Sequence, residues 1–246
     1  MIRRPPRSTL SSSSAASDVY KRQPFDFTAD ISIEDAGLLA KNLGIEHSEI
    51  SIKEMYESFS LALKESFEGM GIDKTEENLQ SRCRGVTLMA LSNKLGFLVL
   101  TTGNKSEAAV GYSTLYGDTA GGFSVLKDVS KTLVYELANY RNSLSVVIPK
   151  RIIERPPSAE LAPDQKDTDS LPDYDRLDPI IEMYVEDDKS IQEIINEGFD
   201  EKEVRRIVSL IDFNEYKRRQ APLGIKISDR NFGKDRRYPI TNSWKP

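Results

Sequence analysis

The chain has 246 residues, of which 38% are hydrophobic and 30% are charged, enough for one sizeable core in one or two domains. No apolar run reaches about 18 residues, which argues against a membrane span. The single cysteine, Cys83, excludes an intramolecular disulfide and fits a reducing compartment such as the cytoplasm. The net charge of −5 argues against general nucleic-acid binding.

Residues 1–23 differ from the rest of the chain. They contain five basic residues and one acid, and they are rich in serine. Such a composition is compatible with an organelle transit peptide, but the segment also resembles translated sequencing-adapter read-through. We expect 1–23 to be a non-native or disordered segment and 24–246 to be the folded domain.

The first half of the domain alternates between helical and strand patterns. A helix is predicted from Ser32, as its cap, to Gly44, and HSEISI (47–52) alternates as a short strand. Two further helices are predicted over 53–68 and 76–94. FLVLTT (97–102) is a continuous apolar run of the kind found in buried parallel strands. This order is typical of an α/β layered domain.

The stretch LTTGNKSEAAVGYSTLYGDTAGG (100–122) follows that apolar run and carries five of the 14 glycines. Glycine clusters indicate sharp bends or a close approach of the backbone to another group. Because ligands of open α/β sheets bind beyond the carboxyl ends of strands, this loop and the next helix start suit an anion. Lys127 and Lys131 are placed to neutralise phosphate, and Glu107 to hold a metal. The alternative is an ordinary helix start with an acidic first turn.

The second half is predicted to be mostly helical. A helix is predicted over 131–142, and the segment 154–175, rich in Pro, Asp and Ser, is predicted to be a long loop or lid. A helical C-terminal region is predicted over 174–187, 190–198 and 200–219, and Pro222 ends it.

Other polar residues are weaker candidates. Asn78 and Arg82 in ENLQSRCR share a helical face and suit carboxylate or phosphate binding, although a solvated basic face is the better explanation of this stretch alone. His47 has no nucleophile nearby in the sequence, so a structural role is the simpler interpretation. The Arg- and aromatic-containing tail is compatible with RNA stacking, but a single short tail in an acidic chain argues weakly for it.

Six motifs occur in the order expected of one family. They are ENLQSR, TTGNKSEAAVGYSTLYGDTAGG, KDVSKTLVYELANYRN, RPPSAEL, PDQKDTDSLPDYDRLD and NFGKDRRYPITNSW. Together they resemble the synthetase domain of NAD synthetases, and the KDRRYPITNSW ending resembles the glutamine-dependent type. The resemblance implies a Rossmann-like adenine-nucleotide hydrolase (ATP pyrophosphatase) α/β fold with a parallel sheet, incomplete at its N-terminus, plus the helical C-terminal region.

The resemblance also implies a reaction and a homo-oligomer. ATP-dependent amidation of deamido-NAD proceeds through an adenylate, releases AMP and pyrophosphate, and takes its nitrogen from glutamine or ammonia. Mg²⁺ accompanies ATP. By matching motifs, the resemblance assigns ATP contacts to Thr102, Lys131 and Ser158. It assigns deamido-NAD contacts to Asn78, Arg82, Glu107 and Lys217, with Glu107 also binding Mg²⁺. Leu115 stands where ammonia-using relatives carry a lysine, so that contact is not carried over.

One departure from the family pattern stands out. The SGGxDS loop, which cradles the pyrophosphate in this family, does not occur in the sequence. We therefore expect the chain to lack the first strand, the pyrophosphate loop and a glutaminase domain, and to be inactive alone. Two alternatives remain: a non-catalytic nucleotide-binding or oligomerisation chain, and a related amide-forming pyrophosphatase that acts on another carboxylate.

Overall fold

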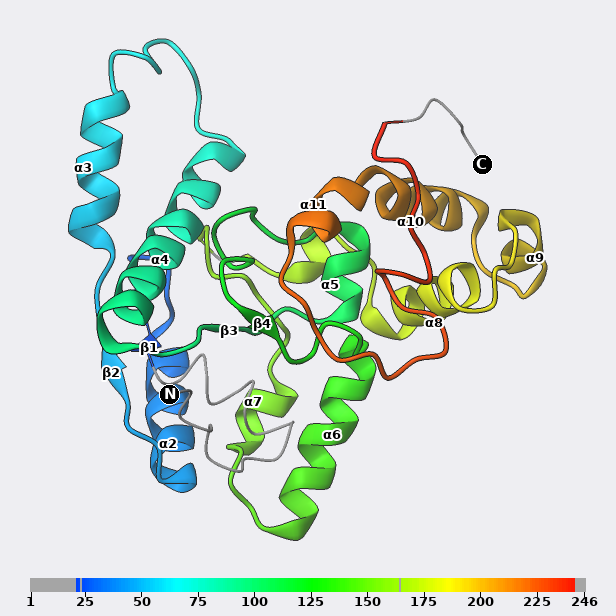
Figure 1. The fold of residues 1–246 in the computed structure, drawn as a ribbon, viewed down its shortest axis with the longest axis horizontal. Coiled ribbons are helices and arrows are strands. Elements are labelled where there is room, and N and C mark those ends of the chain that lie inside the picture. The colour runs from blue at the N-terminus through cyan, green and yellow to red at the C-terminus, as the bar shows by residue number, and fades with distance from the viewer. Residues whose placement is uncertain (1–20, 23, 164, 242–246) are drawn as a thin grey trace.

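The computed structural model describes residues 21–22, 24–163 and 165–241 (Figure 1). Of the segment expected to be non-native or disordered, residues 1–20 and 23 lie outside the described residues, and Lys21–Arg22 form strand β1. No helix in the described part of the chain combines the length and the apolar character needed to cross a bilayer.

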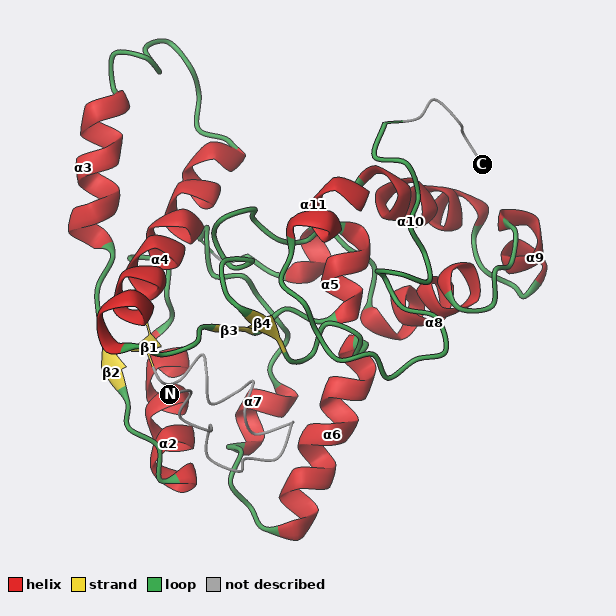
Figure 2. Cartoon of the chain, viewed as in Figure 1, coloured by secondary structure: helices red, strands yellow, loops and turns green. Residues whose placement is uncertain are grey.

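The N-terminal helices lie together on one side of the molecule (Figure 2). They are α2 (Asp30–Leu43), α3 (Lys53–Leu63) and α4 (Lys74–Leu95). Gly44 ends α2 as predicted, with a left-handed φ of 65°. The prediction that Ser32 caps this helix is wrong: α2 begins earlier, and the Ser32 hydroxyl donates to Glu160 instead. α4 begins with a capping box in which the Asp73 side chain accepts from Thr75 N and Glu76 accepts from Asp73 N.

The strands are short and parallel. β1 pairs with β2 (Ser48–Glu49), and β3 (Leu100–Thr101) pairs with β4 (Phe123–Ser124), the latter strand not predicted. Each pair is joined through a helix, as parallel pairing requires. The parallel sheet is confirmed, but within the described residues it consists of two separate pairs. The buried strand predicted over 97–102 is wrong for its first half, because Phe97 and Leu98 are exposed.

Three helices lie between β3 and the C-terminal region, the first of them before β4. They are α5 (Lys105–Val110), α6 (Lys131–Leu144) and α7 (Lys150–Glu154). The predicted loop over 154–175 is confirmed for the described residues 155–163 and 165–173, with one 3₁₀ turn at Asp167–Asp169. α6 begins at the predicted residue because the Ser130 hydroxyl accepts from Leu133 N.

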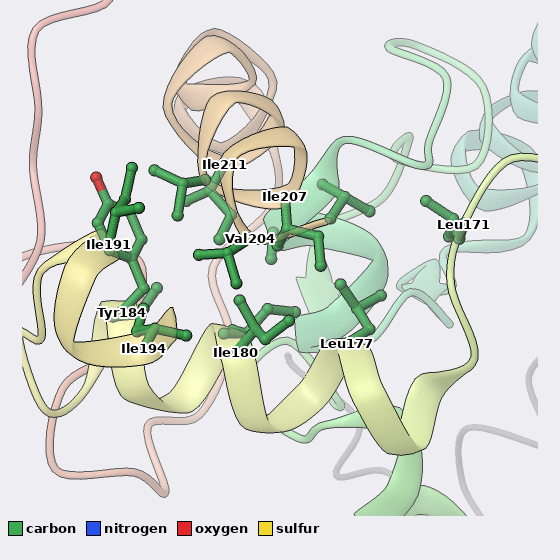
Figure 3. Close-up of a cluster of buried hydrophobic side chains, with 14 of the residues drawn as sticks. Leu171, Leu177, Ile180, Tyr184, Ile191, Ile194, Val204, Ile207 and Ile211 are labelled. Carbon is green, nitrogen blue, oxygen red and sulfur yellow. The ribbon is translucent and has the colours of Figure 1, made fainter. Parts of the chain in front are cut away.

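The predicted helical C-terminal region is confirmed. It comprises α8 (Tyr174–Val185), α9 (Ile191–Asn196), α10 (Glu201–Phe213) and α11 (Glu215–Gln220). Figure 3 shows apolar side chains of α8, α9 and α10 pointing toward one another, with Leu177 and Ile180 from α8 facing Val204 and Ile207 from α10. These four side chains are at most 1% exposed, and α5 packs on the same cluster through Ala109 and Val110. The largest hydrophobic core therefore supports α5, whose N-terminus adjoins the candidate site.

Candidate functional site

The candidate site begins where β3 ends. Thr102 and Gly103 lead into α5, whose cap residue Asn104 accepts from Glu107 N (3.0 Å), while the Glu107 carboxylate accepts from Asn104 N (3.3 Å). Lys105 N donates to Val129 O at 2.8 Å. These helix-start amides, suggested by the sequence as an anion site, already have protein acceptors. The chemistry of the site therefore depends on side chains rather than on the end of this short helix.

Glu107 and Lys131 face each other across the starts of α5 and α6. Lys131 Nζ lies 3.1 Å from Glu107 Oε1, and both side chains are about one-fifth exposed. Burial alone would lower the pKa of Lys131, but the Glu107 carboxylate outweighs this, and the pKa is raised. Lys131 is therefore a cation at neutral pH and is available to a polyphosphate.

A buried carboxylate that the sequence analysis missed holds this arrangement together. Asp178 of α8 accepts from the hydroxyl of Ser106 and from both N and Oγ1 of Thr132 (2.9 and 2.8 Å). Ser106 in turn accepts from Lys131 N at 2.8 Å. Asp178 thus joins α8 to α5 and α6 by hydrogen bonds. These bonds fix the spacing of α5 and α6, and with it the geometry of the Glu107–Lys131 pair. Only the DYDRLD motif pointed to this residue.

The predicted site residues converge on one cavity of about 950 Å³. Six of the seven line it: Asn78, Thr102, Glu107, Lys131, Ser158 and Lys217. They come from α4, the β3–α5 connection, α5, α6, the 154–173 loop and α11. Apolar side chains of α2, α6 and α7 line the rest. A partly apolar cavity of this size with a few convergent polar groups is typical of a small-molecule site.

Arg82 is the predicted residue that the structure does not bring to the cavity. Its exposed side chain donates from Nε to Leu115 O at 3.2 Å, outside the cavity lining. Lys217 does line the cavity, but its Nζ donates to Gly111 O (2.6 Å) and Ser113 O (2.8 Å). Burial lowers the pKa of Lys217. Lys127 also holds backbone, through Pro222 O, and is absent from the cavity lining.

The glycines of the 111–122 loop approach the protein itself. A Cβ on Gly117 would lie 2.2 Å from Ser81 Oγ, and one on Gly85 of α4 would lie 2.6 Å from Tyr116 O. Cβ atoms on Gly121 and Gly122 would meet Thr101 and Leu98. The close approach that the glycine cluster predicted is therefore confirmed, but its partners are α4, the β3 segment and, at Gly111, the side chain of Asn214.

Asp118, another residue that the sequence analysis did not assign, lines the cavity from this loop. Its Oδ1 accepts from Thr114 N (2.6 Å) and from Ser81 Oγ (3.3 Å). The residue is exposed to solvent at the cavity, but the protein groups packed near its carboxyl reduce hydration, which raises the pKa to about 6 against the lowering effect of the Thr114 bond.

The 154–173 loop forms another wall of the cavity. The Ser158 hydroxyl donates to Gln165 O and accepts from Glu160 N at 3.1 Å. Asp167, buried on the same wall, accepts from Tyr174 Oη at 2.8 Å. The predicted lid is thus an ordered wall with its own internal hydrogen bonds.

The protein oxygens at the cavity could hold a metal ion only if a bound substrate supplied further ligands. Across residues 24–163 and 165–241 no group of three or more His, Cys, Asp or Glu side chains could hold an ion. Glu107 offers carboxylate oxygens at the cavity wall. Mg²⁺ commonly takes one or two carboxylates, with substrate phosphates and water completing the shell, and Glu107 fits that mode.

The chain is similar to known proteins over most of its length. Residues 21–221 match the family model of NAD synthase. The chain is 56% identical over 225 residues to the glutamine-dependent NAD(+) synthetase of Acinetobacter baylyi, a match covering 91% of this chain and 42% of that protein.

Solved structures of known proteins are also similar to this chain. The glutamine-dependent NAD+ synthetase from Acinetobacter baumannii, solved in complex with ADP, is 50% identical with a TM-score of 0.55, covering 91% of this chain and 40% of that one. The NMN synthetase from Francisella tularensis is 28% identical with a TM-score of 0.68, covering 84% and 82%. The chain thus spans about two fifths of the length of the glutamine-dependent relatives it matches.

Proposed function

Because this chain belongs to the NAD synthase family, we propose that it carries the synthetase half-site that converts deamido-NAD into NAD. The nicotinate carboxylate attacks the α-phosphate of ATP and releases pyrophosphate. Ammonia, free or derived from glutamine, then displaces AMP. The observation that carries the proposal is the convergence of six predicted contact residues on one cavity.

The proposed roles follow from where each side chain lies. Lys131 is a partly buried cation beside Glu107, suited to stabilise charge on the leaving pyrophosphate. Thr102 lines the cavity where ATP is proposed to bind, and Ser158 would contact ATP through its hydroxyl only if it released Gln165 O. Asn78 and Lys217 line the part of the cavity beside the 111–122 loop, where deamido-NAD is proposed to bind. Arg82 keeps its proposed deamido-NAD role only if it leaves Leu115 O.

Glu107 is the residue proposed to hold Mg²⁺, together with phosphate oxygens of ATP. The ion would supply charge neutralisation on the polyphosphate. Glu107 itself would orient that charge while keeping Lys131 in place. Apolar side chains at the cavity wall, including Leu88 and Val134, would limit the access of water to the adenylate.

We further propose that this 246-residue chain binds nucleotide but forms NAD poorly by itself. Its sequence contains no SGGxDS loop, so the pyrophosphate lacks one set of donors. Within the described part of the chain, the two strand pairs are also not joined into one sheet. A non-catalytic nucleotide-binding or oligomerisation chain is the alternative function that these same observations favour. Self-association is proposed from family membership. Cytoplasmic location is proposed from family membership and from the single cysteine.

The test measures binding and turnover separately. Calorimetry with ATP and Mg²⁺, and with deamido-NAD, is expected to give saturable binding of both. NAD formation from ATP, deamido-NAD and ammonia is expected to be nearly absent. Binding of neither ligand would contradict the proposed site. Binding of ATP with another carboxylate, but not with deamido-NAD, would favour an amidating enzyme of different substrate. Ready NAD formation would contradict the proposed inactivity and leave the site intact.

A further inference from the structure

A hydrogen bond inside the cavity wall links the 111–122 loop to α4. Thr114 Oγ1 donates to Asn78 Oδ1 at 2.8 Å, and both residues line the cavity. We propose that Thr114 is a positioning residue that fixes the Asn78 amide so that its Nδ2 group faces the ligand. The identity of that ligand rests on the proposed function, but the positioning itself does not.

The chemistry of the amide gives this bond its consequence. An asparagine side chain has one acceptor oxygen and one nitrogen with two donors, and the two ends point in different directions. The Thr114 hydroxyl uses one of the two lone pairs of Oδ1 and turns that end of the amide toward the loop, so Nδ2, with two protons to donate, is the end turned away from Thr114. Among residues 24–163 and 165–241, Nδ2 has no hydrogen-bond acceptor, while Asn78 is partly exposed to the cavity.

Thr114 is itself held firmly, which a positioning residue requires. It is 8% exposed, its N donates to Asp118 Oδ1 at 2.6 Å, and its carbonyl accepts from Thr119 Oγ1 at 3.1 Å. Lys217 Nζ holds the preceding carbonyl, that of Ser113, at 2.8 Å. Gly117 packs closely against Ser81, so the loop lies directly against α4. The Thr114 hydroxyl therefore has little freedom to follow a reoriented amide.

This arrangement specifies the ligand group that Asn78 meets. A donor on the ligand would face the donors of Nδ2, whereas a carboxylate, phosphate or carbonyl oxygen would be bound. For deamido-NAD, the group at Asn78 is therefore one of its acceptor oxygens. Breaking the Thr114 bond would let the amide rotate, which should weaken that contact without removing the cavity.

The first experiment needs no ligand. The side-chain amide pair of Asn78 is followed by ¹H–¹⁵N NMR in the full chain. In wild type and Thr114→Ser it is expected to show two dispersed signals typical of a fixed amide. In Thr114→Val, which keeps the shape but lacks the hydroxyl, the pair should move to the positions of a free asparagine. Thr114→Ala replaces the valine variant if the backbone spectrum shows misfolding. An unchanged Asn78 pair in the folded variant would overturn the proposal.

The second experiment measures deamido-NAD binding by calorimetry. Thr114→Val is expected to bind about tenfold more weakly, the equivalent of one lost hydrogen bond to an anion, and Thr114→Ser about as well as wild type. In an Asn78→Ala background, Thr114→Val should cause no further loss, because its effect passes through Asn78. Thr87→Val is the control: it makes the same change at a buried α4 threonine whose hydroxyl donates to Cys83 O away from the cavity.

Two results of the binding experiment count against the positioning. Additive losses from Thr114→Val and Asn78→Ala would mean that Thr114 acts independently, and an equal loss in Thr114→Ser would mean that the hydroxyl is irrelevant. If wild type binds no deamido-NAD, the proposed function fails, and the NMR comparison alone then decides whether Thr114 positions Asn78.

Discussion

Lys131 Nζ lies 3.1 Å from Glu107 Oε1, and this ion pair joins the starts of α5 and α6 at the cavity wall. The pair places a cation beside the carboxylate that we propose to bind Mg²⁺, both at the wall of one cavity. Because Asp178 accepts hydrogen bonds from the first turns of both α5 and α6, the geometry of the pair does not depend on a bound ligand.

Glu107→Gln should weaken Mg²⁺-dependent ATP binding by about tenfold. Glutamine can still accept from Asn104 N, so the capping box and the helix should persist. Calorimetry with ATP, with and without Mg²⁺, measures the change. Glu203→Gln, which breaks an ion pair with Arg176 outside the cavity, is the matched control. An unchanged Mg²⁺ dependence would remove Glu107 from the proposed metal site.

Gly117→Ala should lower the free energy of unfolding by about 1–3 kcal/mol, the usual cost of overpacking. The added Cβ would meet Ser81 Oγ at 2.2 Å and the Ser81 backbone carbon at 2.9 Å, so the loop must shift off α4. Urea unfolding measures the loss. At Gly71 nothing lies within 4 Å of an added Cβ, so Gly71→Ala should be nearly neutral. Equal effects at both glycines would contradict the packing argument.

Asp128→Asn should destabilise the chain at neutral pH and much less in acid. Asp128 is 4% exposed and accepts from Ile227 N and Ser228 N, each at 2.8 Å, and pairs with buried Lys105 at 2.9 Å. Burial alone would raise its pKa, but these bonds outweigh burial and the pKa is lowered.

The sign follows from that lowered pKa. The stabilisation is present above the ordinary aspartate value of about 4 and is lost as pH falls through the folded-state value. The variant should therefore lose about 2 kcal/mol at pH 7, with the gap to wild type closing below about pH 4. Unfolding curves at both pH values check this. Asp26→Asn, in an exposed pair with Lys53, should cost at most about 0.5 kcal/mol at either pH.

Ile207→Ala should cost about 2–5 kcal/mol of stability, because the side chain is 1% exposed inside the α8–α10 cluster. Thermal or urea unfolding measures it. Leu61→Ala, at a position 74% exposed on α3, makes a similar truncation and should change stability by less than about 0.5 kcal/mol. A comparable loss at Leu61 would mean that the α3 surface is covered in solution.

Local signals in the sequence predicted much of the fold. The 131–142 pattern predicted the start of α6, and Gly44 predicted the end of α2, because periodicity and helix-ending residues act within a few residues. Strand extent was predicted poorly, since 97–102 pairs only at Leu100–Thr101. Ladder hydrogen bonds depend on a neighbouring strand that is distant in the sequence.

The sequence by itself determined the family, the helical C-terminal region and six of the residues that meet in the cavity. The family motifs and their order can be read along the sequence without knowledge of any tertiary contact. Only the tertiary structure decided that Asn78 reaches the cavity while Arg82, four residues on along α4, turns to Leu115 O. It also decided that the glycine-rich loop presses on α4, and that Thr114 holds the Asn78 amide. These outcomes depend on which distant groups satisfy each donor and acceptor, and no local pattern encodes that.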